Sequence, residues 1–176
     1  MDKAGYILLA DDNATDVEMV RRALAVNKFA NEVVVVEDGE EALDYLYRRG
    51  KFHARRQGNP LVVVLDLKMP KVDGLEVLRQ IKGDAELRTI PAVMFTSSDE
   101  SADVTESYRL GVNAFVVKPV DFQQFVKTIH AIGLFWTATN EPPPESRAPH
   151  NPQCSLLEPA TGQSAVLAGS GSSGGH

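Results

Sequence analysis

Residues 61–70 read Leu-Val-Val-Val-Leu-Asp-Leu-Lys-Met-Pro, so that an unbroken apolar run ends at a single acid, Asp66. A short apolar run without alternation is typical of a strand that is buried on both faces of a parallel sheet. The carboxylate that follows lies where open α/β sheets bind their ligands, at the carboxyl ends of the strands. The stretch therefore predicts both a parallel sheet and a site at its edge.

Further apolar runs have the same unbroken character, and segments with helical spacing lie between them. Together with the first, the runs span residues 6–10, 33–36, 61–65, 92–95 and 114–117. Short strands that alternate with helices form a parallel sheet whose crossovers are right-handed. We therefore predict an α/β fold with a doubly wound, five-stranded parallel sheet.

Several of the intervening segments begin with a residue that suits a helix N-cap. Each is followed by Glu or Gln at the spacing of a capping box. The pairs are Thr15 with Glu18, Asp38 with Glu41, Asp73 with Glu76, and Asp121 with Gln124.

The segment at 99–110 differs from the other predicted helices, because it has few apolar residues with which to pack on the sheet. We expect it to dock weakly, unless it is an ordinary polar helix that ends at Gly111.

The composition limits the partners and the location of the protein. The chain has 176 residues, a formal net charge of −6 and one cysteine, Cys154. Affinity for a phosphate backbone needs clustered Lys and Arg in excess, and this chain is acidic overall, so we expect no direct nucleic-acid partner. A lone cysteine forms no intrachain disulfide, and no apolar stretch suits a signal peptide or a membrane span. We therefore predict a cytoplasmic protein without membrane contact.

The regular pattern of strands and helices stops near Trp136. The sequence beyond it is rich in Pro, Gly and Ser, a composition that does not support a buried core. We therefore predict one domain at residues 1–137 and a disordered tail at residues 138–176.

Acidic residues directly follow two of the predicted strands. Asp11 and Asp12 come after the run at 6–10, and Asp66 comes after the run at 61–65. We expect these carboxylates to gather at one edge of the sheet. A hard divalent cation would relieve their repulsion, and few carboxylates plus water suit Mg²⁺, with Mn²⁺ as an alternative. Taken alone, Asp11 and Asp12 could be a helix-capping pair, and Asp66 could begin a loop.

Two further strand ends carry groups that suit a phosphoryl ligand. Thr96 follows the run at 92–95, and Lys118 follows the run at 114–117. A hydroxyl and an ammonium supply the donors and the counter-charge that phosphoryl oxygens need. Separately, Thr96 could be a structural strand end and Lys118 a surface lysine. Their occurrence together with the acids favours a phosphoryl site.

The ordered set of motifs resembles the receiver domain of bacterial response regulators. The resemblance covers about residues 5–136, and these stretches carry it: Leu8-Leu9-Ala10-Asp11-Asp12-Asn13, Leu65-Asp66-Leu67-Lys68-Met69-Pro70 with Asp73-Gly74-Leu75, Thr96-Ser97-Ser98, and Phe115-Val116-Val117-Lys118-Pro119. It implies a flavodoxin-like (βα)5 fold with strand order 2-1-3-4-5. It also implies a single-domain regulator that relays a signal by protein–protein interaction and is no enzyme for external substrates.

The resemblance assigns a role to each residue of the site. Asp66 would accept a phosphoryl group from a phosphohistidine of a sensor histidine kinase. Asp12, Asp66 and the backbone carbonyl of Lys68 would bind Mg²⁺ directly, whereas Asp11 would act mainly through water. Lys118 would pair with a phosphoryl oxygen.

The same resemblance implies a switch, a cis peptide bond and a means of tuning dephosphorylation. Thr96 would move towards the phosphoryl group and let Phe115 turn inward, although Phe115 could be a purely structural core residue. The Lys118–Pro119 bond would be cis. Lys68 and Ser98 would flank the path of the hydrolytic water. The cation of Lys68 could screen the phosphoryl charge or displace that water.

A basic stretch and an apolar C-terminal turn indicate a narrower group within this family. Residues 48–56 are basic, and by default they form a solvated loop. Together with Phe135 and Trp136, this stretch resembles the single-domain regulators of bacterial and cyanobacterial phytochrome kinases. Leu134 adds to the apolar surface of these aromatic residues, so we expect a homodimer through the C-terminal helices.

Two other classes of protein remain open. A phosphotransferase or phosphatase of the haloacid dehalogenase type also has a nucleophilic Asp after a strand, but it carries a second Asp where this chain has Lys68. A degenerate receiver would bind partners without being phosphorylated, yet all the expected site residues are present here. Beryllofluoride binding with Mg²⁺ separates these readings.

Overall fold

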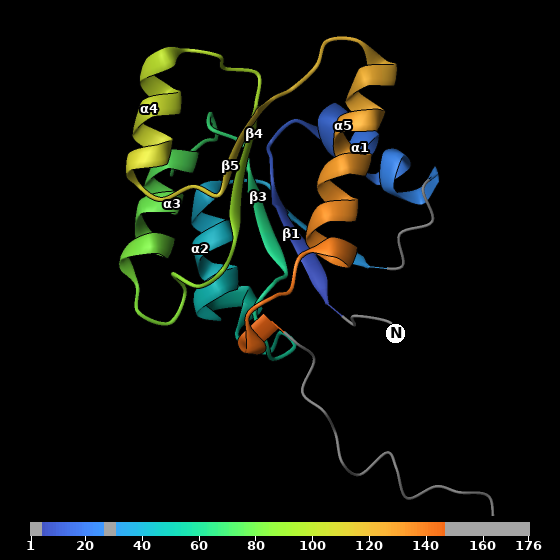
Figure 1. Cartoon of the computed structure of the whole chain (residues 1–176). Helices are drawn as coiled ribbons and strands as arrows, with labels where there is room; N and C mark the ends of the chain where they lie inside the picture. The colour runs from blue at the N-terminus through green and yellow to red at the C-terminus, as the bar shows by residue number, and fades with distance from the viewer. Residues whose placement is uncertain (1–4, 27–30, 147–176) are drawn as a thin grey trace, which may run out of the picture.

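The computed structural model describes residues 5–26 and 31–146, which form one sheet between two layers of helices (Figure 1). All strand pairs are parallel, and the order is β2-β1-β3-β4-β5. The predicted flavodoxin-like sheet is therefore confirmed. Its strands are β1 (Tyr6–Ala10), β2 (Glu32–Val36), β3 (Val62–Leu65), β4 (Ala92–Thr96) and β5 (Ala114–Val117).

Helices cover both faces of the sheet, as Figure 1 shows. One face carries α1 (Ala14–Val26) and α5 (Phe122–Leu134), and the other carries α2 (Gly39–Tyr47) and α3 (Gly74–Gly83), with α4 (Ser101–Arg109) beside α3. A separate apolar cluster fills each space between sheet and helices. No helix in the described part of the chain is long and apolar enough to cross a bilayer.

The strand register brings the predicted site residues to one edge of the sheet. Ala10 of β1 pairs with Leu65 of β3, so the residues that follow, Asp11 and Asp66, are neighbours. The last residue of β4, Thr96, pairs with the last residue of β5. The carboxyl ends of β1, β3, β4 and β5, which are neighbours in the sheet, therefore meet at one edge, as the sequence predicted.

Three of the predicted N-caps are confirmed, and one is wrong. Asp38, Asp73 and Asp121 each accept a hydrogen bond from a backbone N–H in the first turn of α2, α3 and α5. Helix α1 is capped by Asn13 instead of Thr15, because Asn13 Oδ1 accepts a hydrogen bond from the Thr15 N–H at 2.9 Å. Asn is as good an N-cap as Asp and a better one than Thr. The helix therefore begins earlier in the chain than expected.

Helix α4 is thinly anchored, as its sequence predicted. Ser107 is its only buried residue, and Tyr108 is 56% exposed. An ion pair between Arg79 and Glu106, with a nitrogen–oxygen distance of 3.6 Å, links it to α3. Few apolar contacts make a helix easier to shift than its neighbours.

The expected cis peptide bond is absent. Lys118–Pro119 is trans, as is every peptide bond in residues 5–26 and 31–146. The trans form of a bond before proline is favoured by roughly 0.5–1 kcal/mol, and this connection reaches the N-cap Asp121 of α5 with that geometry.

The folded chain continues beyond residue 137, the expected domain boundary. A π-helical turn at Phe135–Thr139 follows α5 and keeps Trp136 in the core. The chain then returns to the amino end of β3, where the Asn59 N–H donates to the Glu145 carbonyl at 2.9 Å. The expectation of an unpacked tail is therefore corrected for residues 138–146, because Pro142 and Ser146 are buried and Glu145 is hydrogen-bonded to Asn59. Residues 147–176 lie outside the described residues.

Candidate functional site

Lys118 lies among three carboxylates at the carboxyl edge of the sheet. Its Nζ is 2.7 Å from Asp11 Oδ2, 2.8 Å from Asp16 Oδ2 and 3.1 Å from Asp66 Oδ2. The lysine side chain is 5% exposed, so water has little access to these three hydrogen bonds. An ammonium has three donors, and each of them here has an acidic acceptor.

The electrostatic environment keeps Lys118 charged. Burial alone would lower the pKa of Lys118, but the hydrogen bonds to Asp11 and Asp16 outweigh it and hold the pKa above its ordinary value. Burial also raises the pKa of Asp11, and the hydrogen bond from Lys118 opposes that rise. A lysine that is charged and fixed in place suits an anion that arrives at this edge.

The acids Asp11, Asp12 and Asp66 form a cluster that fits a divalent cation. One oxygen from each lies within 4.8 Å of the others. Asp11 is buried and Asp12 is exposed, so the cluster has a side open to water. A small set of carboxylate oxygens plus water is the donor set that Mg²⁺ and Mn²⁺ accept.

Asp66 is held by backbone contacts that leave one oxygen for chemistry. Its N–H donates to the Ala10 carbonyl at 2.9 Å, and its Oδ1 accepts from the Leu67 N–H at 2.7 Å. Oδ2 is the oxygen that meets Lys118. The start of α3 packs against the backbone of Asp66, because a Cβ on Gly74 would stand 2.2 Å from the Asp66 carbonyl oxygen.

The other predicted residues lie around this centre without joining it. Thr96 is buried, and its hydroxyl accepts a hydrogen bond from the Ser98 N–H at 3.2 Å. The Ser98 hydroxyl donates to Asp103 of α4 at 2.7 Å, so it is tied to the thinly anchored helix rather than to the acids. Phe115 is half-buried and packs beside the α2–α3 cluster, and the Lys68 side chain is exposed.

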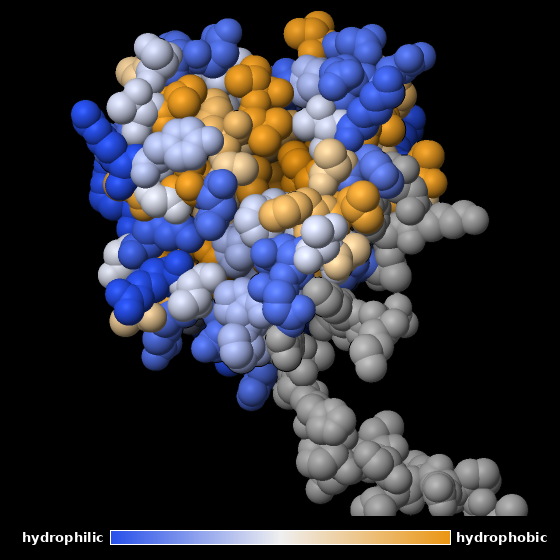
Figure 2. Space-filling view, viewed as in Figure 1, coloured by the Kyte–Doolittle hydropathy of each residue, from blue (hydrophilic) through white to orange (hydrophobic). Residues whose placement is uncertain are grey.

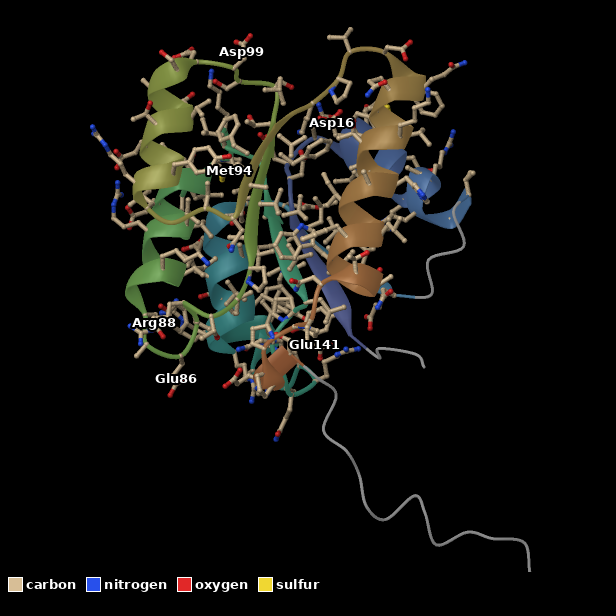
Figure 3. The ribbon with its side chains drawn as sticks, in the orientation of Figure 1. Asp16, Glu86, Arg88, Met94, Asp99 and Glu141 are labelled. Carbon is tan, nitrogen blue, oxygen red and sulfur yellow. The ribbon has the colours of Figure 1, made fainter. Side chains whose placement is uncertain are left out.

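Asp16 is the residue of this centre that sequence reasoning missed. It lies in the first turn of α1, at the same edge of the sheet (Figure 3). In the sequence it is indistinguishable from an acid that stabilises a helix N-terminus. Only the packing of α1 on the sheet beside α5 brings it to Lys118.

Several basic side chains of residues 48–56 make contacts within the domain. The Arg55 side chain lies 4.5 Å from the Tyr45 ring centroid and ties the loop together. Lys51 pairs with Glu41, and Arg56 Nη1 is 2.9 Å from Glu32 Oε2. The Arg55 guanidinium donates to the backbone carbonyls of Tyr45, Leu46, Arg56 and Gly58. Arg55 is therefore packed into the domain, whereas the other basic residues of the stretch, Arg48, Arg49, Lys51 and Arg56, are exposed at its surface.

A parallel sheet in this strand order, with an acidic cluster and a lysine at its carboxyl edge, defines a receiver domain. The sequence model of the response regulator receiver domain matches residues 7–130, and the chain belongs to this family. Among curated proteins, the chain is similar to the response regulator Rcp1 of Synechocystis. The two are 34% identical over 133 residues, which is 76% of this chain and 89% of Rcp1.

Solved structures relate the chain to phytochrome response regulators. Phosphorylated RcpA, a cyanobacterial phytochrome response regulator, is 36% identical, with a TM-score of 0.75 over 80% of this chain and 99% of RcpA. The bacteriophytochrome response regulator AtBRR is 57% identical, with a TM-score of 0.64 over 78% of this chain and 99% of AtBRR. The Mn²⁺-bound form of Rcp1 is 33% identical, with a TM-score of 0.74 over 79% of this chain and 99% of Rcp1.

Proposed function

We propose that Asp66 accepts a phosphoryl group from a phosphohistidine of a sensor histidine kinase, and that the protein relays the signal by protein–protein interaction. The observation that carries this proposal is the contact between Asp66 Oδ2 and Lys118 Nζ at 3.1 Å, next to the acidic cluster. The similarity to RcpA and AtBRR supports a phytochrome-like kinase as the partner.

For this phosphoryl transfer, the protein has mainly to position the reacting groups and to supply positive charge. Asp66 Oδ2 attacks phosphorus, an oxygen–phosphorus bond forms, and the phosphorus–nitrogen bond of the phosphohistidine breaks. The imidazole keeps the electron pair of that bond. Lys118 stays protonated and shifts one donor from Asp66 to a phosphoryl oxygen, where it balances the added negative charge.

Asp11, Asp12, Asp66 and the backbone carbonyl of Lys68 would hold Mg²⁺, with Mn²⁺ as a substitute. The ion would supply positive charge at the phosphoryl oxygens. The cluster of three carboxylate oxygens supports the site. The Mn²⁺-bound form of the related Rcp1 supports the same class of ion.

The switch would run from Thr96 to Phe115 and to the surface around β5. Thr96 is linked through Ser98 to Asp103 of α4, a helix with little apolar anchoring. Figure 2 shows apolar side chains gathered between α4 and α5 on this face. A phosphoryl group that draws Thr96 towards Asp66 would therefore disturb α4 first, and would alter the surface that a partner meets.

Exposed apolar residues at the end of α5 support a homodimer through the C-terminal helices. Leu134 is 46% exposed and Phe135 is 47% exposed. Single apolar residues at a surface are common. These two are adjacent and lie at the end of α5, which favours a contact between two molecules of this protein. Light scattering at high protein concentration tests this part of the proposal, and a monomer with and without beryllofluoride contradicts it.

The remaining assignments follow from the same proposal. The receiver modifies itself and hydrolyses its own acyl phosphate, and it acts on no external substrate. The receiver unit includes the returning segment at residues 138–146, and the protein works in the cytoplasm without contact to nucleic acid or membrane.

Labelling by acetyl phosphate tests the proposed phosphoacceptor. With Mg²⁺, the intact mass should increase by one phosphoryl group, and chelation of the metal should abolish the increase. Asp66→Asn should remain unlabelled, whereas Asp44→Asn, which removes an acid from α2, should label like the wild type. Equal labelling of the wild type and Asp66→Asn would refute the assignment.

A further inference from the structure

Asp16 takes no part in the phosphoryl transfer described above. It nevertheless contacts Lys118, the lysine that would balance the charge of the phosphoryl group. Its Oδ2 lies 2.8 Å from Lys118 Nζ, and its side chain is 16% exposed. Figure 3 places it on α1 beside the carboxyl edge of the sheet. A charge-assisted hydrogen bond largely withdrawn from water is stronger than an ion pair at an open surface.

The three partners of Lys118 are not equivalent. Asp11 and Asp66 belong to the cluster that fits a divalent cation, whereas Asp16 lies outside it. A cation and an ammonium that draw on the same carboxylates compete for their oxygens and repel each other. Once the cluster holds a cation, Asp16 is the acidic partner that Lys118 keeps undisturbed.

We propose that Asp16 is a positioning residue for the phosphoryl site. It holds the Lys118 ammonium at the edge of the pocket, so that the ammonium meets the phosphoryl anion on Asp66 in a fixed place. A lysine has a long flexible stem, and its ammonium spreads over many positions unless a partner restrains it. This inference rests on the proposed function and extends it to a residue of α1.

The accessibility of Lys118 tests the positioning without any phosphoryl ligand. Reductive methylation of the full chain, followed by mass spectrometry, gives the reaction rate of this lysine. Asp16→Ala should raise that rate about threefold or more, and Asp16→Asn should raise it less because its amide oxygen still accepts a hydrogen bond. Glu18→Ala is the control, since Glu18 lies on the same helix and pairs with Arg22. Equal rates in the wild type and Asp16→Ala would overturn the inference.

Beryllofluoride binding in saturating Mg²⁺ tests the consequence for the phosphoryl site. By fluorine NMR titration, Asp16→Ala should bind about tenfold more weakly than the wild type, with Asp16→Asn between them. In a Lys118→Met background the same change should cause no further loss, because only the repulsion between Asp16 and the anion is removed. Weaker binding in both backgrounds would show a general structural defect and would overturn the inference.

The two proposals fail in different ways. If the wild type does not bind beryllofluoride with Mg²⁺, the phosphoryl site is refuted and the positioning of Lys118 has no phosphoryl ligand to serve. If the wild type binds it and Asp16→Ala binds it equally tightly, the phosphoacceptor stands and the role of Asp16 is refuted.

Discussion

The Cα of Gly74 lies so close to the Asp66 carbonyl oxygen that a Cβ at this position would stand 2.2 Å from it. The Gly74 N–H also donates to the Leu67 carbonyl at 2.8 Å, so the start of α3 closes directly over the loop that carries the phosphoacceptor. A side chain here would push the helix away from that loop.

Gly74→Ala should therefore destabilise the protein by about 1–3 kcal/mol and slow labelling by acetyl phosphate. Gly83→Ala is the matched control at the other end of α3, where an added Cβ meets nothing within 4 Å. It should be neutral or stabilising by about 0.5–1 kcal/mol, because Ala favours a helix over Gly. Urea unfolding measures both, and equal effects would show that the close approach is unimportant.

Arg55→Lys should destabilise the domain by about 1–3 kcal/mol, although the charge is kept. A lysine cannot reproduce a planar guanidinium that donates to several carbonyls at once, so buried acceptors lose their partners. Arg49→Lys is the control, because the Arg49 side chain is 57% exposed, and it should change stability by less than about 0.5 kcal/mol. Thermal unfolding of both variants separates a packed connection from a merely basic loop.

Asp38→Asn should reduce stability at neutral pH and lose this effect in acid. Burial alone would raise the pKa of Asp38, but the hydrogen bonds from Lys71 and the Glu41 N–H hold the pKa below its ordinary value. A folded-state pKa below the unfolded one stabilises the protein above about pH 4, and the gain is lost as the pH falls through the folded-state pKa. Asn keeps the N-cap, so the change isolates the charge.

The difference between wild type and Asp38→Asn should be about 1 kcal/mol near pH 7, and it should shrink towards pH 3. Asp44→Asn serves as a surface control, since its ion pair with Arg49 is half exposed. A constant difference across the pH range would contradict a role for the charge.

Lys68→Asn should shorten the lifetime of the acyl phosphate. Lys68 follows Asp66 by two residues and its side chain is exposed, so we infer that its cation screens the phosphoryl charge or displaces the hydrolytic water. We expect hydrolysis to be about threefold to tenfold faster, as followed by loss of the phosphoryl mass after removal of acetyl phosphate. Lys127→Gln removes an exposed charge from α5 and should leave the rate unchanged. An unaltered rate in Lys68→Asn would remove Lys68 as a tuning residue.

The sheet and most of the acidic centre could be predicted because they depend on strand ends. Once Leu65 ends a buried strand and pairs with Ala10, the acids that follow must be neighbours. Asp16 could not be found in this way, since a helix residue reaches Lys118 only through the angle at which α1 packs on the sheet. The return of the chain at 138–146 was also missed, because a backbone hydrogen bond such as that between Asn59 and Glu145 leaves no signal in a Pro-rich sequence.

Asn59 and Glu145 meet at the amino ends of the strands, on the side of the sheet opposite Asp66 (Figure 1). The returning C-terminal backbone is thereby joined to the end of the sheet that does not carry the acidic cluster. A dye or spin label on Glu145 would therefore lie at the end of the sheet away from the acidic cluster, and it would follow the domain without touching the proposed phosphoryl site.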